Sequence, residues 1–171
     1  IIVLVLTFAL TVIFDLVVAI EIGMILACLL LLRRMSEESE VKSWKYIEDE
    51  NDPDSIMLRK VPKHVRVYEI SGPMFFGAAD RIATISVKDF TRCLVIRMRA
   101  VNALDATAMH SLEELYDKLS KKHIAVVFSH VNEQPMHVMQ KAGFVEKVGS
   151  ENFCAHIDEA LERAAGFDSN D

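Results

Sequence analysis

The fold is decided by the stretch Arg99-Ala-Val-Asn-Ala-Leu-Asp-Ala-Thr-Ala-Met-His-Ser-Leu-Glu-Glu-Leu-Tyr-Asp-Lys-Leu-Ser-Lys-Lys122, which joins a strand to an amphipathic helix. The strand is a β-rich run, residues 93–98, and a short polar loop follows it. Asp105 is the expected N-cap of the helix, because its carboxylate can accept hydrogen bonds from the unpaired N–H groups of the first turn. The sequence therefore places a helix N-terminus beside a strand end, at a position suited to binding or modification.

The predicted helix has an apolar face and a polar face. At about 100° per residue, its large apolar residues share roughly one third of the circumference, and its charged residues and histidine occupy the rest. We expect the first set to pack against a sheet and the second to face water. The apolar set is Met109, Leu112, Leu115, Tyr116 and Leu119, and the polar set is His110, Glu113, Glu114, Asp117, Lys118 and Lys121.

The composition divides the chain of 171 residues into an apolar start and an acidic remainder. Residues 1–32 contain only two charged side chains, Asp15 and Glu21. Arg33 and Arg34 balance them, so the formal net charge of -6 belongs to residues 35–171. An acidic soluble part argues against nucleic acid as a partner, because nucleic-acid binding usually requires a basic face.

The three cysteines are far apart and form no CxxC pair. We interpret Cys28, Cys93 and Cys154 as buried free thiols of a protein in a reducing compartment.

The apolar start, within residues 1–34, is predicted to form terminal transmembrane segments with a break near Asp15. A continuous helix of the 32 nearly uncharged residues would be about 48 Å long, well beyond a hydrocarbon core of about 30 Å. Arg33 and Arg34 then place the following chain on the cytoplasmic side by the positive-inside rule. A signal peptide is disfavoured by the absence of an initiating Met and of a basic n-region. The other alternative is an apolar helix pair within a soluble core.

Two ionisable residues lie within this apolar start. Asp15 is most simply a turn residue at the membrane interface, whereas Glu21 lies inside the second segment. An ionisable group within a membrane is a functional candidate, so Glu21 is a candidate for facing a protein interior, for reaching a headgroup or for carrying a proton.

The remainder is predicted to comprise an acidic linker, residues 35–60, an α/β domain, residues 61–166, and a disordered tail, residues 167–171. Short β-rich runs separated by helical patterns are typical of strands joined by crossover helices. The expected elements are a strand at 65–70 with a hairpin turn into 74–76, a helix at 78–85, strands at 93–98 and 124–129, a helix starting near Pro135 and ending before Gly143, a strand at 144–148 and a helix at 153–165.

Three local signatures and the order of the elements resemble the STAS domain, which lies at the cytoplasmic end of sulfate permease family anion transporters and also occurs in bacterial anti-sigma-factor antagonists. The signatures are Ile70-Ser-Gly-Pro-Met-Phe-Phe-Gly-Ala-Ala79, Asn102-Ala-Leu-Asp-Ala-Thr-Ala108 and Met139-Gln-Lys-Ala-Gly-Phe144. The apolar start, Thr11 to Gly23 with Leu32-Arg-Arg-Met35, is similar to the last two membrane segments of the same transporters.

The resemblance implies an α/β fold with a mixed four- or five-stranded sheet and packed helices, preceded by one or two transmembrane helical segments. It implies an inner (cytoplasmic) membrane protein with its STAS domain in the cytoplasm, usually a homodimer, that moves sulfate, bicarbonate, chloride or organic anions. In that family the anion site is built from earlier membrane segments, so this chain would be a C-terminal fragment with a regulatory, assembly or partner-binding role. Neither enzymatic activity nor a cofactor is expected.

The predicted partner- or anion-binding loop comprises Asn102, Asp105, Ala106 and Thr107 at the helix N-terminus. In anti-sigma-factor antagonists the residue after this Asp is a serine that a kinase phosphorylates, and here it is Ala106. Thr107 is the nearest hydroxyl, and the helix dipole would favour a phosphate on it. Its alternative role is that of a first-turn cap.

Other chemistry finds little support in the sequence. The six histidines show no HxxxH spacing with a carboxylate partner, and no cysteine pair completes a zinc site, so no metal is expected. Phosphate-binding motifs of the GxxxxGK[ST] and GxGxxG types are absent. Two rival hypotheses stay open: a membrane-tethered signalling module, similar to an anti-sigma-factor antagonist, that binds a cytoplasmic protein without transport, and a nucleotide-binding domain that uses the helix N-terminus at Asp105.

Overall fold

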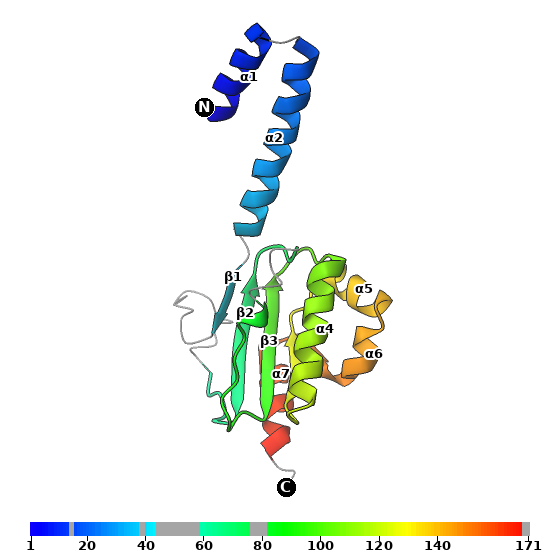
Figure 1. Cartoon of the computed structure of the whole chain (residues 1–171). Helices are drawn as coiled ribbons and strands as arrows, with labels where there is room; N and C mark the ends of the chain where they lie inside the picture. Colours follow the sequence, from blue (N-terminus) through cyan, green and yellow to red (C-terminus); the bar gives the residue numbers. More distant parts are fainter. Residues whose placement is uncertain (14–15, 38–39, 44–58, 76–81, 169–171) are drawn as a thin grey trace. The chain divides into compact units, whose positions relative to one another are not determined.

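The computed structural model of the chain describes residues 1–13, 16–37, 40–43, 59–75 and 82–168. They form two compact units, which comprise Ile1–Glu37 and Glu38–Asp171. The first is a pair of helices and the second is an α/β domain (Figure 1).

The helices of the first unit, α1 (Ile2–Ile13) and α2 (Leu16–Glu37), end and begin on either side of the expected break. Gly23 of α2 lies against Thr7 of α1, since a Cβ built at Gly23 would approach the Thr7 Oγ1 to 3.0 Å. Glycine therefore lets the two helices approach closely.

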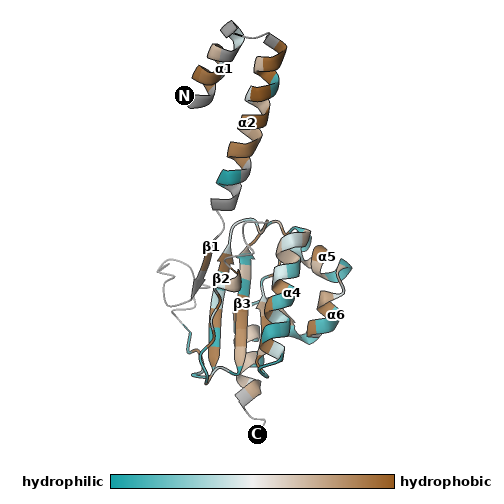
Figure 2. Ribbon diagram, viewed as in Figure 1, coloured by the Kyte–Doolittle hydropathy of each residue, from teal (hydrophilic) through white to brown (hydrophobic). Residues whose placement is uncertain are grey.

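Large apolar side chains are exposed along both helices, which are coloured mostly as hydrophobic in Figure 2. Leu4 is 73%, Phe8 69% and Ile25 61% exposed. Among the residues described, no helix combines the length and the hydropathy needed to cross a membrane. The transmembrane segments predicted within residues 1–34 therefore stay a prediction.

The second unit is built on a five-stranded mixed sheet in the order β1-β2-β3-β4-β5. The first pair, β1 with β2, is antiparallel, and the pairs from β2 to β5 are parallel. This confirms the predicted α/β class and mixed sheet. The strands are β1 (Glu40–Ser43), β2 (Val65–Ser71), β3 (Cys93–Ala100), β4 (Ala125–Ser129) and β5 (Phe153–Cys154).

Helices cover both faces of this sheet (Figure 1). On one face α4 (Ala106–Ser120) contributes Leu112 and Leu119 to a core with Leu94 and Ile96 of β3. On the other face α7 (Ile157–Ala165) packs on Cys93 and Val95. The central strand is therefore buried on both sides, which explains its nearly continuous apolar run.

The predicted hairpin after β2 is wrong. Gly72, with φ 85°, turns the chain, but Met74 does not pair back with β2. It forms a parallel bridge with Leu104, in which the Met74 N–H donates to the Ala103 carbonyl at 2.8 Å and the Met74 carbonyl accepts from Asp105 N–H at 3.0 Å. The long-range loop contact replaces the local turn contact that the Ser-Gly-Pro sequence suggested.

The predicted strand at 144–148 is also wrong, because Phe144–Val148 forms the short helix α6. Phe144 and Val148 are four residues apart and both buried, so they share one face of a helical turn. A short apolar run does not distinguish a strand from a helical turn by its periodicity. The preceding helix α5 (Glu133–Lys141) has Pro135 in its first turn and Gly143 after its end, as predicted. The φ angle of Gly143 is 70°.

The closing segment differs from the single helix predicted at 153–165. Phe153 and Cys154 form β5, a 3-10 turn, η4 (Ser150–Asn152), precedes them, and α7 begins only at Ile157. The Phe153 ring stacks on Phe128 of β4 with centroids 5.0 Å apart, which fixes this segment as the edge strand.

Three further expectations fall on segments that the structure describes only in part. The predicted linker contains β1, while residues 44–58 lie outside the described part. The predicted disordered tail begins within a 3-10 turn, η5 (Gly166–Asp168), whose Phe167 packs on the α7 side of the core. Of the predicted helix at 78–85, residues 78–81 lie outside the description, and Ile82 and Ile85 are buried.

The three cysteines are free thiols, but only one is buried as predicted. Cys93 is fully buried, Cys154 is half-buried and Cys28 is exposed on α2. Burial raises the pKa of the Cys93 thiol to about 12, although Arg163 opposes this shift.

Candidate functional site

The loop between β3 and α4 lies at the carboxyl edge of the parallel strands. In parallel sheets the carboxyl ends of neighbouring strands meet at one edge, where ligands commonly bind. The loop is fixed on one side by the Met74 bridge described above, and its Val101 and Leu104 side chains are buried. The loop backbone is therefore part of the folded core and presents a fixed surface.

Two amide side chains from the start of α5 hold the other side of the loop. The Asn132 Nδ2 donates to the carbonyls of Arg99 at 3.0 Å and Val101 at 2.7 Å. The Leu104 N–H donates to the Gln134 Oε1 at 2.8 Å, and the Gln134 Nε2 donates to the Leu104 carbonyl at 3.2 Å. These bonds satisfy backbone groups of the loop and of the strand end before it.

Asp105 caps α4 as predicted, because its Oδ1 accepts a hydrogen bond from the Ala108 N–H at 2.8 Å. Ala106 and Thr107 are exposed in the first turn. The cap therefore belongs to Asp105, and the Thr107 hydroxyl makes no hydrogen bond to the residues that the structure describes, while the Thr107 carbonyl accepts from the Ser111 hydroxyl at 3.2 Å.

A groove of about 770 Å³ lies beside this loop and along α5. Asn102 contributes from the loop, so the structure brings one predicted site residue to it. Amide, imidazole and carboxylate groups line the groove, and none of the lining residues is Lys or Arg. Such a surface offers hydrogen-bond donors and acceptors but no cationic anchor. The other lining residues come from α5 and from its N-cap position: Asn132, Glu133, Gln134, Met136, His137 and Gln140.

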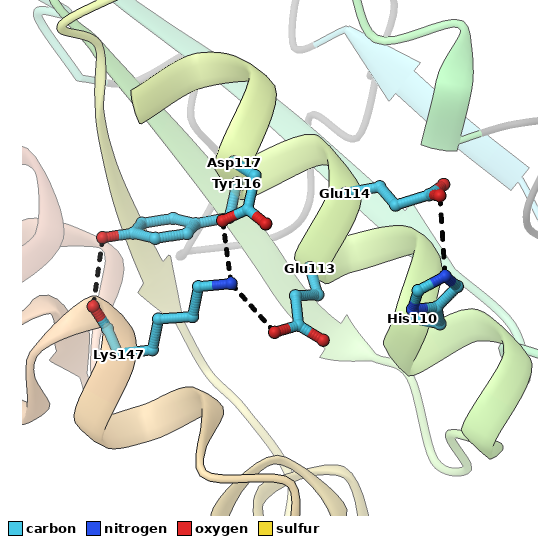
Figure 3. A network of polar contacts seen from close by, with 6 residues as sticks. All are labelled: His110, Glu113, Glu114, Tyr116, Asp117 and Lys147. Atoms are coloured by element: carbon cyan, nitrogen blue, oxygen red, sulfur yellow. Dashed lines mark hydrogen bonds and ion pairs between the residues drawn. The ribbon is translucent and has the colours of Figure 1, made fainter. Parts of the chain in front are cut away.

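An ion-pair network fastens α6 to the polar face of α4 (Figure 3). The Lys147 Nζ lies 2.9 Å from the Glu113 Oε1 and 2.8 Å from the Asp117 Oδ1, and the Tyr116 hydroxyl donates to the Lys147 carbonyl at 3.1 Å. The Asp117 and Glu113 carboxylates raise the pKa of Lys147. Glu113 and Asp117, predicted to face water, are therefore half-buried under α6, whereas Glu114 is 70% exposed as predicted.

A second polar cluster lies at the N-terminus of α7. The rings of His130 and His156 meet edge to face at 5.5 Å, and the Asp158 carboxylate is bonded by Arg59 through Nε and through Nη2. The Arg59 guanidinium lowers the pKa of Asp158. Within the described residues, no three His, Cys, Asp or Glu side chains gather in a way that could hold a metal ion.

The predicted ionisable residues of the apolar start are far from this loop in the sequence and belong to the first unit. Glu21 is exposed on α2. Asp15 lies outside the described residues.

Sequence reasoning missed Asn132 and Gln134 as functional residues, although it placed a helix start there. Their position directly after β4 was the available signal, because the loops that follow adjacent parallel strands lie at the same edge of the sheet. Their amide chemistry alone gave no indication of which backbone groups they bind.

Comparison with known proteins matches residues 56–160 to the model of the STAS domain. The protein named "Putative sulfate transporter YvdB" from Bacillus subtilis is 29% identical over 156 residues, covering 90% of this chain and 28% of its own length. The bicarbonate transporter BicA from Synechocystis is 30% identical over 165 residues, covering 91% of this chain and 28% of its own. The chain thus spans little more than a quarter of these relatives.

Among solved structures, the crystal structure of a sulfate transporter family protein from Wolinella succinogenes superposes with a TM-score of 0.64 at 35% identity. The match covers 70% of this chain and 100% of that one.

Proposed function

This chain belongs to the STAS domain family, and from that premise we propose that it is the C-terminal part of a sulfate permease family secondary anion transporter. Its α/β unit would be a cytoplasmic module for regulation, assembly and partner binding, without enzymatic activity. The anion site would lie in membrane segments of the full-length protein, which would function as a homodimer in the cytoplasmic membrane.

One observation carries this proposal: the alignments with two transporters extend over 90% and 91% of this chain, so they reach beyond the α/β unit into the apolar helix pair. A membrane-tethered module similar to an anti-sigma-factor antagonist would be expected to resemble these transporters in the α/β unit alone. The joined arrangement therefore favours the transporter.

The apolar helix pair supports a membrane setting. Leu4, Phe8 and Ile25 are each more than half exposed, and exposed apolar surface costs about 25 cal/mol per Å² in water. Lipid and the other transporter segments would cover these side chains. Arg33 and Arg34 would lie at the cytoplasmic interface, and Glu21 would face neighbouring segments.

The loop and the α5 groove would bind a protein partner. The groove has no Lys or Arg in its lining, which favours recognition of polar groups of a protein over tight binding of a free anion or a nucleotide. Ala106 occupies the position of the switch serine of anti-sigma-factor antagonists, so the usual phosphorylation site is missing. Thr107, exposed in the first turn, would be the remaining site for a kinase.

The transport part of the proposal is tested by uptake into liposomes. The full-length protein, encoded with its upstream segments, should take up labelled sulfate or bicarbonate, whereas the 171-residue chain should not. Absence of uptake of sulfate, bicarbonate and chloride by a correctly folded full-length protein would contradict the proposal and favour the tethered signalling module.

The regulatory part is tested by a matched pair of variants of the full-length protein. His137→Trp fills the groove beside α5, while His110→Trp places the same ring on the exposed face of α4, where His110 is 71% exposed. We expect the groove variant alone to change the cellular uptake rate by about twofold or more, since a coupling of this size is ordinary between a binding site and a distant function. Equal effects of the two variants would refute a role for the groove.

A further inference from the structure

A second groove, of about 630 Å³, opens at the amino end of β2. Val61, Pro62 and Phe90 supply its apolar surface, and Lys63 and Arg66 supply its cationic surface. Phe90 is 52% exposed, the largest exposure among the aromatic side chains described in the α/β unit. An exposed aromatic ring at a groove is a typical anchor point for a protein partner.

Two cationic side chains lie over the Phe90 ring. The Arg66 guanidinium carbon lies 5.0 Å from the Phe90 ring centroid, and the Lys88 Nζ lies 5.9 Å from it. These cation–π contacts place two positive charges on an exposed apolar surface. The charges and the apolar contact would therefore be available to one ligand.

The positive charge of this groove is not neutralised by the described residues. Lys63, Arg66 and Lys88 form no ion pair within the described ranges, in contrast to Lys147, whose ammonium group contacts two carboxylates. Residues 59–66 and 88–92 contain six Lys or Arg and a single carboxylate, Asp89, in a chain whose net charge is -6. The groove is thus a cationic region on an acidic protein.

We propose that this groove binds an acidic peptide segment of a soluble protein partner. One apolar side chain of the segment packs against Phe90, and its flanking carboxylates lie against Lys63, Arg66 and Lys88. Complementary charge provides partner selection and a faster association rate, and the apolar contact at the centre provides the affinity.

The position of the groove favours a protein over a lipid surface, and this step alone rests on the proposed function. The chain enters the α/β unit at Glu40, which pairs with Ser71 at the carboxyl end of β2. The groove lies at Val65, the opposite end of the strand, which at about 3.3 Å per residue is roughly 20 Å away. In the proposed transporter the chain reaches this unit at Glu40, so the groove lies one strand length along β2 from the point of entry, and we infer a protein rather than a lipid surface as its ligand.

The test uses the full chain in detergent and a fluorescein-labelled peptide of glutamates around one central leucine, with binding followed by fluorescence anisotropy. Lys63→Glu combined with Lys88→Glu should raise the Kd of this peptide by about tenfold or more, because it reverses two facing charges. The matched control, Lys118→Glu with Lys141→Glu, makes the same change in net charge on α4 and α5 and should leave the Kd within about twofold.

A second pair of measurements separates the apolar anchor from charge alone. Phe90→Ala should raise the Kd of the leucine peptide by about fivefold, because it removes one side-chain contact of modest size. It should leave unchanged the Kd of a peptide with alanine in place of leucine. Equal effects of the two double variants, or equal affinity for the two peptides, would overturn the proposal. The proposal would also be overturned if the Lys63→Glu/Lys88→Glu variant lost binding to phosphatidylglycerol vesicles but bound the peptide as tightly as the wild type. None of these readings depends on transport, so their failure is distinct from that of the proposed function.

Discussion

The side-chain amide of Gln134 hydrogen-bonds with Leu104 in the way that a neighbouring strand would, accepting from its N–H at 2.8 Å and donating to its carbonyl at 3.2 Å. On its other side Leu104 is bridged to Met74. Leu104 is therefore a single strand position completed by a side chain, and this arrangement fixes the loop from which Asp105 begins α4.

Gln134→Ala should destabilise the α/β unit by about 1 to 3 kcal/mol, because it removes the partner of two backbone groups at once. Urea unfolding of the full chain measures this, and hydrogen exchange of the Leu104 amide should become faster. Gln140→Ala, at an exposed position of the same helix, is the matched control and should change stability by less than about 0.5 kcal/mol. Equal effects would mean that the amide pairing contributes nothing.

Leu112→Ala should destabilise the unit by about 2 to 5 kcal/mol, because the side chain is only 1% exposed beneath α4 and its removal leaves a cavity. Glu114→Ala, two residues later and 70% exposed, should cost less than about 0.5 kcal/mol. Denaturant unfolding of both variants provides the comparison. A negligible loss for the leucine variant would place the apolar face of α4 away from the sheet.

The sequence was sufficient for α4 and the central strands because each carries a strong local signal. Asp105 is a capping residue directly before an amphipathic period, and the run from Cys93 to Ile96 is apolar on both faces. Local propensity and tertiary burial agree at these positions, so the periodicity predicted both the element and its buried face.

The elements that were wrong are those whose identity depends on distant contacts. Met74 pairs with Leu104, thirty positions later in the numbering, and Phe153 becomes a strand because it stacks on Phe128. Neither partner is visible to a local window. The candidate site was incomplete for the same reason, since Asn132 and Gln134 act on backbone atoms of a loop that precedes them in the chain.

Cys93 should resist iodoacetamide in the folded protein, whereas Cys154 should be alkylated. The thiolate is the reactive form, and burial raises the pKa of Cys93 to about 12 and leaves its sulfur inaccessible. Burial also raises the pKa of Cys154, but its side chain is half-buried and sits at the sheet edge. Peptide mass spectrometry after brief alkylation at mild alkaline pH distinguishes the two. Equal labelling without urea would show that β3 opens on the timescale of the reaction.

The Arg59 guanidinium beside Asp158 lowers the pKa of this carboxyl below its ordinary value of 3.8. The unfolded chain therefore takes up the proton at higher pH than the folded one, so the stabilisation is fully present above about pH 4 and is lost as the pH falls through the folded-state pKa. Because Asp158 is 65% exposed, solvent screening limits the effect, and Asp158→Asn should cost no more than about 1 kcal/mol at neutral pH. Urea unfolding at neutral pH and near pH 3 should show the difference between the wild type and this variant shrinking on acidification. Glu162→Gln, an exposed substitution on the same helix, is the control for a change of charge alone. If the two variants lost stability equally at neutral pH, the pair with Arg59 would have no stabilising role.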